Sequence, residues 1–208
     1  MPTVSVCMAV YNGEATIGQV LDTVLYQSRK PDEILVLDDG SSDASAEIAE
    51  SKGARVIRTA NGGLGAARKQ LVEEAKGELI AFIDHDDDWL PNKLEIQLPH
   101  FDDPDVVLCH TDGWYVYEDG SSVARDLDEP LVGSFDHILP SNWIIASSAI
   151  FRRDAMLVAG NFVAETVRCS DWYGWLILAP QGKFVHVREK LVKYRVLSSS
   201  LANAGLRF

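Results

Sequence analysis

Apolar positions in the first half of the chain alternate between two periods. Short, nearly continuous apolar runs are typical of strands buried on both faces, and they cover residues 3–10, 33–40, 54–59 and 77–84. Between these runs apolar residues recur every three or four positions, which predicts helices over 17–25, 44–51 and 64–76. Strands that alternate with helices in this way predict a parallel sheet covered by helices on both faces.

The second half of the chain has a less regular pattern. A strand from about residue 104 is expected to run into a hairpin, because "EDGSS" supplies turn residues. An apolar run at 143–151, a helix over 171–179 and two short strands, 183–187 and 191–196, follow. We find no internal repeat, and we expect both halves to share one sheet in a single domain.

Composition narrows the classes of function. A chain of 208 residues with 47% hydrophobic side chains can bury a full core, and its net charge of −12 disfavours binding to nucleic acid or anionic lipid. The three cysteines are widely spaced and form no CxxC pair, which indicates neither a disulfide framework nor a zinc site. A reducing cytoplasm fits best. No signal segment and no apolar stretch of about 18 residues is found, so we expect no membrane span.

Polar motifs follow each predicted strand of the first half. The first strand ends in "AVYNG", the second in "DDG", the third in "NGGLGAAR" and the fourth in "DHD". Ligands of open α/β sheets bind outside the carboxyl ends of the strands, where these motifs converge. The sequence therefore predicts a ligand site at this edge.

The segment "FIDHDDDWL" has four aspartates between residues 84 and 88. Close carboxylates repel one another, so such a cluster is either a solvated loop or the binding site of a cation. An EF-hand is excluded, because Trp89 stands where its glycine belongs and a strand precedes the loop. The remaining candidate is Mg²⁺ or Mn²⁺, held by one or two carboxylates and by phosphate oxygens.

The glycine-rich turn "NGGLGAAR" resembles a dinucleotide fingerprint, with Gly63 and Gly65 in place but Arg68 at the third small position. A dinucleotide fold carries its glycines after the first strand, so NAD binding is the weaker interpretation. Arg68 shares a helix face with Leu71 and Ala75, which predicts that it points inward. A snorkelling stem with a solvated head is the alternative.

Two further carboxylates each have two interpretations. Asp39 is suited to capping the next helix, but Asp43 can do so instead, which leaves Asp39 for a ligand. In "CSDWYGWLILA" Ser170 is a candidate N-cap, and Asp171 is either a partner of the helix dipole or a general base beside aromatic residues. The residues alone do not choose between these roles.

Taken together, "VSVCMAVYN", "DDGSSD", "NGGLGAAR", "FIDHDDDW" and "SDWYGWL" resemble, in order and spacing, the family 2 inverting nucleotide-sugar glycosyltransferases. The resemblance implies the GT-A fold: an α/β domain with a mostly parallel, Rossmann-like sheet, helices on both faces and a smaller mixed C-terminal acceptor region. Residues 1–208 would form one domain. Residues 1–103 would bind the nucleotide sugar, and residues 104–208 would bind the acceptor and carry the base.

The resemblance also implies roles for single residues. Asp39 would accept hydrogen bonds from the nucleobase and Arg68 would contact base or phosphate. Asp171 would be the general base, in a Ser170-Asp171 pair where the family has Glu-Asp. Ala9 and Tyr11 would flank the nucleobase and ribose. Asp84, His85 and Asp86 would form the DxD motif, with Asp84 toward the ribose and Asp86 as the ligand of Mn²⁺ or Mg²⁺. Trp143 and Trp172 would stack on a sugar or belong to the core.

The implied reaction is a metal-dependent, inverting transfer from a nucleoside-diphosphate sugar to a hydroxyl of a saccharide or lipid-linked saccharide, in cell-surface polysaccharide or glycoconjugate synthesis. It would take place in the cytoplasm, with peripheral association at the inner membrane face compatible with the sequence. The chain departs from the family at Leu197, where members often carry histidine, and it lacks the membrane helices and QxxRW motif of processive synthases, which favours single transfer. The sequence makes no prediction of oligomeric state.

Two rival functions remain. A non-catalytic nucleotide-sugar or carbohydrate-binding module of the same fold would bind without turnover. A sugar nucleotidyltransferase is less favoured, because it would carry a glycine-rich phosphate loop with Arg or Lys where this chain has "YNGEAT".

Overall fold

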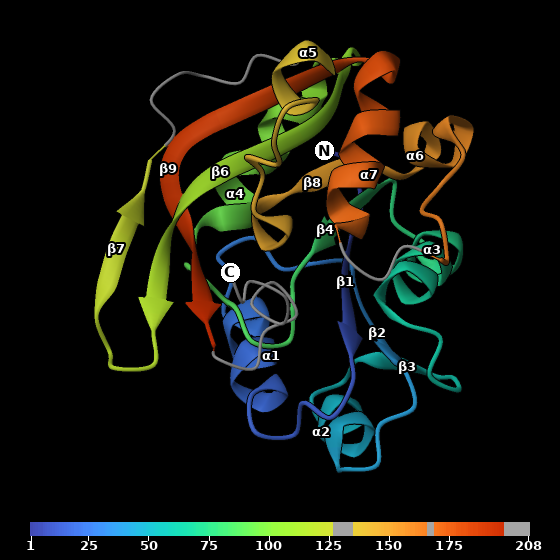
Figure 1. Ribbon diagram of the computed structural model, residues 1–208, viewed down its shortest axis with the longest axis vertical. Coiled ribbons are helices and arrows are strands. Elements are labelled where there is room, and N and C mark those ends of the chain that lie inside the picture. The colour runs from blue at the N-terminus through green and yellow to red at the C-terminus, as the bar shows by residue number, and fades with distance from the viewer. Residues whose placement is uncertain (127–134, 166–168, 198–208) are drawn as a thin grey trace.

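The computed structural model describes residues 1–126, 135–165 and 169–197, whose strands form one nine-stranded sheet (Figure 1). The strands are β1 (Val4–Val10), β2 (Glu33–Asp38), β3 (Arg55–Arg58), β4 (Leu79–Phe82), β5 (Asp88–Trp89), β6 (Val106–Tyr117), β7 (Ser122–Arg125), β8 (Ile150–Arg152) and β9 (Lys183–Val196). Their order is β3-β2-β1-β4-β8-β6-β9-β5, with β7 paired to β6. The prediction that both halves share one sheet is confirmed.

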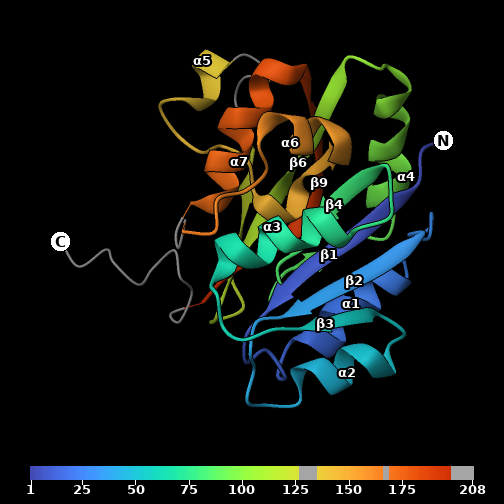
Figure 2. The same ribbon diagram turned by 90° about the vertical axis from the view of Figure 1, so that its right-hand side faces the viewer.

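The helices lie on both faces of this sheet, as Figure 2 shows for α3 on one side and α1 and α2 on the other. The α-helices are α1 (Ile17–Leu25), α2 (Ser45–Ser51), α3 (Leu64–Glu74), α4 (Lys93–Gln97), α5 (Phe135–Ile138), α6 (Arg153–Ala159) and α7 (Ser170–Leu178), and the 3₁₀ turns are η1 (Leu98–Asp102), η2 (Ala146–Ser148) and η3 (Ala179–Gln181). One apolar core packs against α1, α2 and α4, and the other against α3, α6 and α7.

The first half follows the predicted pattern closely. Strands β3, β2, β1 and β4 pair in parallel, and each lies within a range predicted from its apolar run. Val6 and Leu79 are fully buried, as strands covered on both faces require. The carboxyl ends of β1, β2 and β4 therefore meet at one edge of the sheet.

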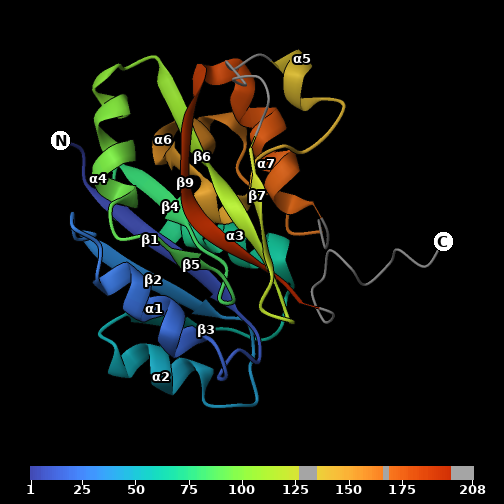
Figure 3. The ribbon, with the colours of Figure 1, turned by 90° about the vertical axis from the view of Figure 1, so that its left-hand side faces the viewer.

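The second half differs from its predicted pattern in two places. The expected strands 183–187 and 191–196 form a single curved strand, β9, which runs parallel to β6 (Figure 3). Shifts in register near Thr111 and Asp112 accommodate the exposed polar residues between the two apolar runs. The run 143–151 forms η2 and the short strand β8, which pairs antiparallel with β4 and β6. Strand β5 and helices α4, α5 and α6 were not predicted.

In the part of the chain that the structure describes, every helix is too short or too polar to cross a lipid bilayer.

Candidate functional site

The carboxyl edge of the parallel strands brings together the motifs found in the sequence. Tyr11 follows β1 with 51% of its surface exposed, and Ala9, near the end of the same strand, is partly buried. Asp39 follows β2 and Asp84 lies just beyond β4. The structure thus places the predicted residues of the first half along one rim.

Asp39 is held by the glycine-rich turn. Its two carboxylate oxygens accept the N–H groups of Gly62 and Gly63, at 2.8 and 2.9 Å. Gly63 has φ +86°, a conformation that favours glycine. The expectation that Asp43 caps the next helix is wrong, because Ala44 is the capping residue of α2, although Asp43 accepts the N–H of Ser45, the first residue of that helix. Each oxygen of Asp39 keeps a lone pair for a ligand.

The acidic loop has a closed side made of Asp87 and Asp88. Asp87 is fully buried and accepts hydrogen bonds from the Ser147 hydroxyl and, at 3.0 Å, from the N–H of Arg195. Its burial and the charges of Asp84 and Asp86 raise its pKa well above the usual range. Asp88 forms an ion pair of 2.6 Å with Arg195. Both carboxylates therefore have hydrogen-bond or ion-pair partners within the protein.

The open side of the loop consists of Asp84, His85 and Asp86. The carboxylate of Asp84 contacts Arg68 Nη2 at 3.2 Å, and the backbone N–H of Asp84 donates to Ser147 Oγ. His85 Nδ1 lies 3.2 Å from the hydroxyl of Thr16. In the described residues, Asp86 has no hydrogen bond or ion pair with another side chain. Burial, followed by the charge of Asp84, raises the pKa of Asp86.

This open side fits a divalent cation. An unpartnered carboxylate beside a second one carries an electrostatic cost that a cation would remove. Within residues 1–126, 135–165 and 169–197, no group of three or more His, Cys, Asp or Glu side chains is arranged to hold a metal. A cation at Asp86 would have to take most of its oxygen ligands from a bound phosphate.

Arg68 of α3 points inward, as predicted, with only 4% of its surface exposed, so the snorkelling alternative is wrong. Its Nη1 donates to Ser170 Oγ at 2.8 Å and lies 3.8 Å from Asp171 Oδ1, and its Nη2 contacts Asp84. Its guanidinium carbon lies 5.5 Å from the centre of the Phe82 ring. The guanidinium thus joins α7 to the acidic loop.

Asp171 lies in the first turn of α7 and its side chain is 19% exposed. Its Oδ2 accepts a hydrogen bond of 2.7 Å from Asn142 Nδ2. The prediction that Ser170 is the N-cap is wrong, because Cys169 is the capping residue and Ser170 is buried against Arg68. Cys169 has φ 57°, an uncommon conformation for a residue with a side chain.

The two candidate stacking residues differ in their surroundings. The indole N–H of Trp172 donates to the Ile138 carbonyl at 2.7 Å, which ties this ring to the protein. Trp143 is 42% exposed and follows Asn142, the partner of Asp171. Trp143 is therefore the better placed of the two to meet a ligand at Asp171.

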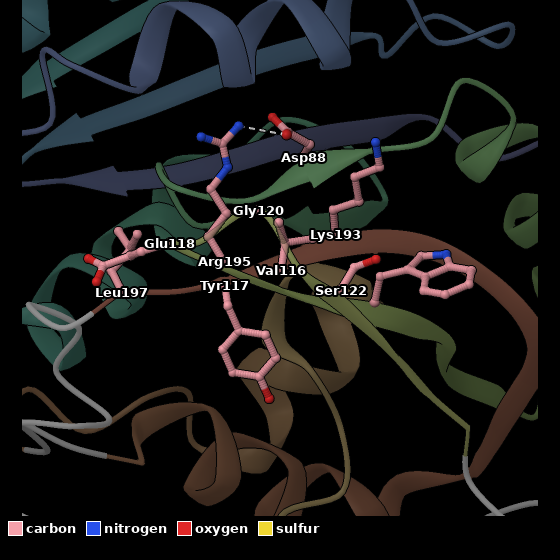
Figure 4. Close-up of a pocket in the computed structure, with 10 residues that line it drawn as sticks. Asp88, Val116, Tyr117, Glu118, Gly120, Ser122, Lys193, Arg195 and Leu197 are labelled. Atoms are coloured by element: carbon pink, nitrogen blue, oxygen red, sulfur yellow. Dashed lines mark hydrogen bonds and ion pairs between the residues drawn. The ribbon is translucent and has the colours of Figure 1, made fainter.

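A groove of about 570 Å³ lies near the ends of β6 and β9 (Figure 4). Arg195 and Lys193 line it together with Asp88. Side chains alternate between the faces of a strand, so Lys193 and Arg195 lie on the opposite face from Tyr194. Burial and the charges of Asp87, Asp84 and Asp86 raise the pKa of Tyr194. The groove thus lies on the face of β9 opposite Tyr194, and the ion pair of Asp88 with Arg195 belongs to its lining.

Sequence reasoning missed three residues that shape the site: Ser147, Asn142 and Arg195. Ser147 lies in the apolar run "WIIASSAIF", which two adjacent serines interrupt. A polar residue at a buried position needs a partner, and this was the available signal. The partners themselves, Asp84 and Asp87, are more than 50 residues away.

The chain is similar to known proteins in sequence and in fold. The sequence profile described as Glycosyl transferase family 2 matches residues 5–155, which is most of the chain. The chain belongs to glycosyl transferase family 2. This family 2 chain is 38% identical to the uncharacterized glycosyltransferase RT0329 of Rickettsia typhi, over 99% of its own length and 67% of that protein.

Solved structures show the same fold for this family 2 chain. TarS of S. aureus, in complex with UDP-GlcNAc, matches with a TM-score of 0.81 and 20% identity, over 97% of this chain and 61% of the other. The mannosyltransferase PcManGT of Pyrobaculum calidifontis, in complex with GDP-Man and Mn²⁺, matches with a TM-score of 0.73 and 17% identity, over 96% of this chain and 58% of the other. The fold is the GT-A fold. The chain spans 33% to 67% of the length of the first three curated relatives it matches.

Proposed function

We propose that this chain carries a metal-dependent, inverting glycosyltransferase activity that moves a sugar from a nucleoside-diphosphate sugar to a hydroxyl acceptor. The observation that carries this proposal is the position of Arg68, which contacts both the partly exposed carboxylate of Asp171 and Asp84, a member of the loop that carries the open carboxylate of Asp86. Membership of family 2 supports it, as do the UDP-GlcNAc in the TarS structure and the GDP-Man and Mn²⁺ in the PcManGT structure.

The donor would bind along the carboxyl edge of the parallel strands, within residues 1–103. Tyr11 and Ala9 flank the nucleobase and ribose in this proposal. Asp39, oriented by Gly62 and Gly63, accepts hydrogen bonds from the base. Asp84 and His85 lie toward the ribose and diphosphate.

Asp86 would hold Mn²⁺ or Mg²⁺. When bound, the cation neutralises charge that develops on the departing diphosphate, which is worth several kcal/mol. Because Asp86 has no side-chain partner in the described part of the chain, it can become a ligand without losing an internal contact.

Asp171 would act as the general base. An acceptor hydroxyl is a weak nucleophile until a positioned carboxylate takes its proton as attack proceeds. Asn142 holds Oδ2 of Asp171, which leaves Oδ1 to receive that proton. Attack in one step, opposite to the leaving diphosphate, inverts the anomeric configuration.

The acceptor would lie within residues 104–208, near the exposed ring of Trp143. Its class would be a saccharide or a lipid-linked saccharide of cell-surface polysaccharide or glycoconjugate synthesis. The reaction would take place in the cytoplasm, at the inner face of the membrane for a lipid-linked acceptor.

The test is a turnover assay with UDP, GDP and dTDP sugars in the presence of Mn²⁺, with release of the nucleoside diphosphate as the readout. Asp171→Asn should reduce turnover by about 10²–10⁴-fold while leaving nucleotide binding intact. Asp154→Asn is the matched control, because Asp154 occupies the same helical position at the start of α6 and is exposed.

Two outcomes would contradict the proposal. Turnover retained by Asp171→Asn would place the base elsewhere. Binding of a nucleotide sugar by the wild-type chain with no transfer and no hydrolysis would favour the binding-module alternative.

A further inference from the structure

The buried guanidinium of Arg68 contacts groups from two elements that are far apart in the sequence. Nη1 donates to Ser170 Oγ at the start of α7, and Nη2 lies 3.2 Å from Asp84 Oδ1 in the acidic loop. The ring of Phe82 lies 5.5 Å from the guanidinium carbon. With 4% of its surface exposed, Arg68 is engaged mainly by protein groups.

We propose that Arg68 is a positioning residue that fixes the distance and orientation between the general base Asp171 and the cation-binding loop. This inference rests on the proposed function and replaces the role that the resemblance implied, which was contact with the nucleobase or phosphate. The side chain orients two reacting groups through Ser170 and Asp84.

The fork geometry of arginine is what this role requires. Its two terminal nitrogens point at different partners, so one rigid group can hold two elements in a fixed relation. A lysine at position 68 would bring one point charge and could not serve both partners with the same geometry. The Phe82 ring and the burial restrict the guanidinium further.

Arg68 contacts two residues of α7, Ser170 and Asp171, at different distances, and this difference suits a general base. Nη1 is at hydrogen-bond distance from the neutral hydroxyl of Ser170, at 2.8 Å, and only at ion-pair distance from Asp171 Oδ1, at 3.8 Å. The positive charge therefore holds Asp171 in place without occupying Oδ1 with a short hydrogen bond. Asn142 occupies the other oxygen. Oδ1 remains free to accept the proton of the acceptor.

The test separates turnover from binding. Arg68→Lys should lower kcat by about 10²-fold, and Ser170→Ala by about tenfold, since small displacements of reacting groups have effects of this size. Neither change should alter the Kd of the nucleoside diphosphate in the presence of Mn²⁺ by more than about twofold. Arg153→Lys is the matched control, because Arg153 is a partly buried arginine whose guanidinium, in the described part of the chain, donates to the Val72 and Glu73 carbonyls.

A double-mutant cycle tests the connection itself. Asp84→Ala and Ser170→Ala remove the two hydrogen-bond partners of Arg68, and we expect their effects on kcat to be coupled by about threefold or more. The coupling should vanish when the cycle is repeated in the R68K background. Additive effects on kcat in the wild-type background would overturn the inference. A large loss of nucleotide affinity in Arg68→Lys, together with an unchanged kcat in Ser170→Ala, would also overturn it.

The same cycle can be measured on the free energy of unfolding, which needs no turnover. If the wild-type chain transfers no sugar, the proposed function fails, and coupling in stability between Asp84 and Ser170 still tests the connection. Coupling absent from both measurements would show that Arg68 does not join the two elements.

Discussion

The two sides of the acidic loop carry similar charge and have different surroundings. Asp87 and Asp88, on the closed side, are satisfied by Ser147, by the N–H of Arg195 and by its guanidinium. On the open side, Asp86 has no side-chain partner in the described structure, and Asp84 is held by one buried arginine. A buried carboxylate with protein partners is typical of a structural role, whereas a partly buried carboxylate without a side-chain partner is suited to binding a ligand. The density of charge in the sequence does not by itself mark the site.

The largest effect is expected from Asp86→Asn. Removal of the cation ligand should reduce Mn²⁺-dependent turnover by at least about 10²-fold. Stability should stay the same or rise, because the raised pKa of Asp86 means that its charged form is disfavoured in the folded state. Steady-state kinetics at several Mn²⁺ concentrations and urea unfolding measure the two effects. Unchanged dependence of turnover on Mn²⁺ would show that the open side of the loop does not bind the cation through Asp86.

The opposite pattern is expected from Asp87→Ala. The change leaves the hydroxyl of Ser147 and the N–H of Arg195 without their buried acceptor, which costs about 2–3 kcal/mol of unfolding free energy. Part of this cost is offset, because the raised pKa of Asp87 means that its charged form is disfavoured in the folded state. Urea unfolding would measure this loss. A change below about 0.5 kcal/mol would mean that the closed side does not hold the loop.

Lys93 provides a second buried charged group without a hydrogen-bond partner in the described residues, and it lies away from the candidate site. Its ammonium lies 4.2 Å from the Trp89 ring centre and has no hydrogen-bond partner among the described residues. Burial lowers the pKa of Lys93 to about 7, whereas an unfolded lysine titrates near 10.4.

Between these values the unfolded state holds one more proton than the folded state. Lys93 therefore destabilises the folded state by an amount that falls as pH rises from about 7 to about 10, so the free energy of unfolding rises by up to roughly 1.4 kcal/mol per pH unit. Lys93→Met should flatten this part of the pH profile and stabilise the protein at pH 7. An identical profile in the variant would show that Lys93 is solvated.

The smallest effect is expected from Asp88→Asn. The Asp88–Arg195 pair is partly exposed to solvent, so its loss should change the unfolding free energy by less than about 1 kcal/mol. Nucleotide binding with Mn²⁺ should match the wild type. A loss of binding comparable to that of Asp86→Asn would show that both sides of the loop hold the ligand.

The sequence predicted the parallel half of the fold because its signals are local. The apolar runs of β1 and β4 and the helical spacing around Arg68 need no information from distant residues. The single strand β9 could not be predicted, since a polar segment inside a strand is tolerated only where the partner β6 shifts register. Strand β5 has two residues and depends on β9 for its pairing.

The candidate site was predicted in its residue types and not in its contacts. Adjacent aspartates in one loop have the same local pattern, so the sequence cannot tell that Asp87 faces Ser147 while Asp86 does not. The role of Arg68 depends on Ser170, which lies 102 residues away. Such contacts are set by tertiary packing, which a local pattern does not encode.

The central claim is that the open side of the acidic loop holds a cation shared with a nucleoside diphosphate. Calorimetric titration of UDP, GDP, dTDP, CDP and NAD, each with and without Mn²⁺, tests it most directly in the wild type, Asp86→Asn and Asp88→Asn. The account predicts that one nucleoside diphosphate binds the wild type and Asp88→Asn only with Mn²⁺, and that Asp86→Asn loses this binding. Equal affinity with and without Mn²⁺ in the wild type, or binding of NAD alone, would contradict it.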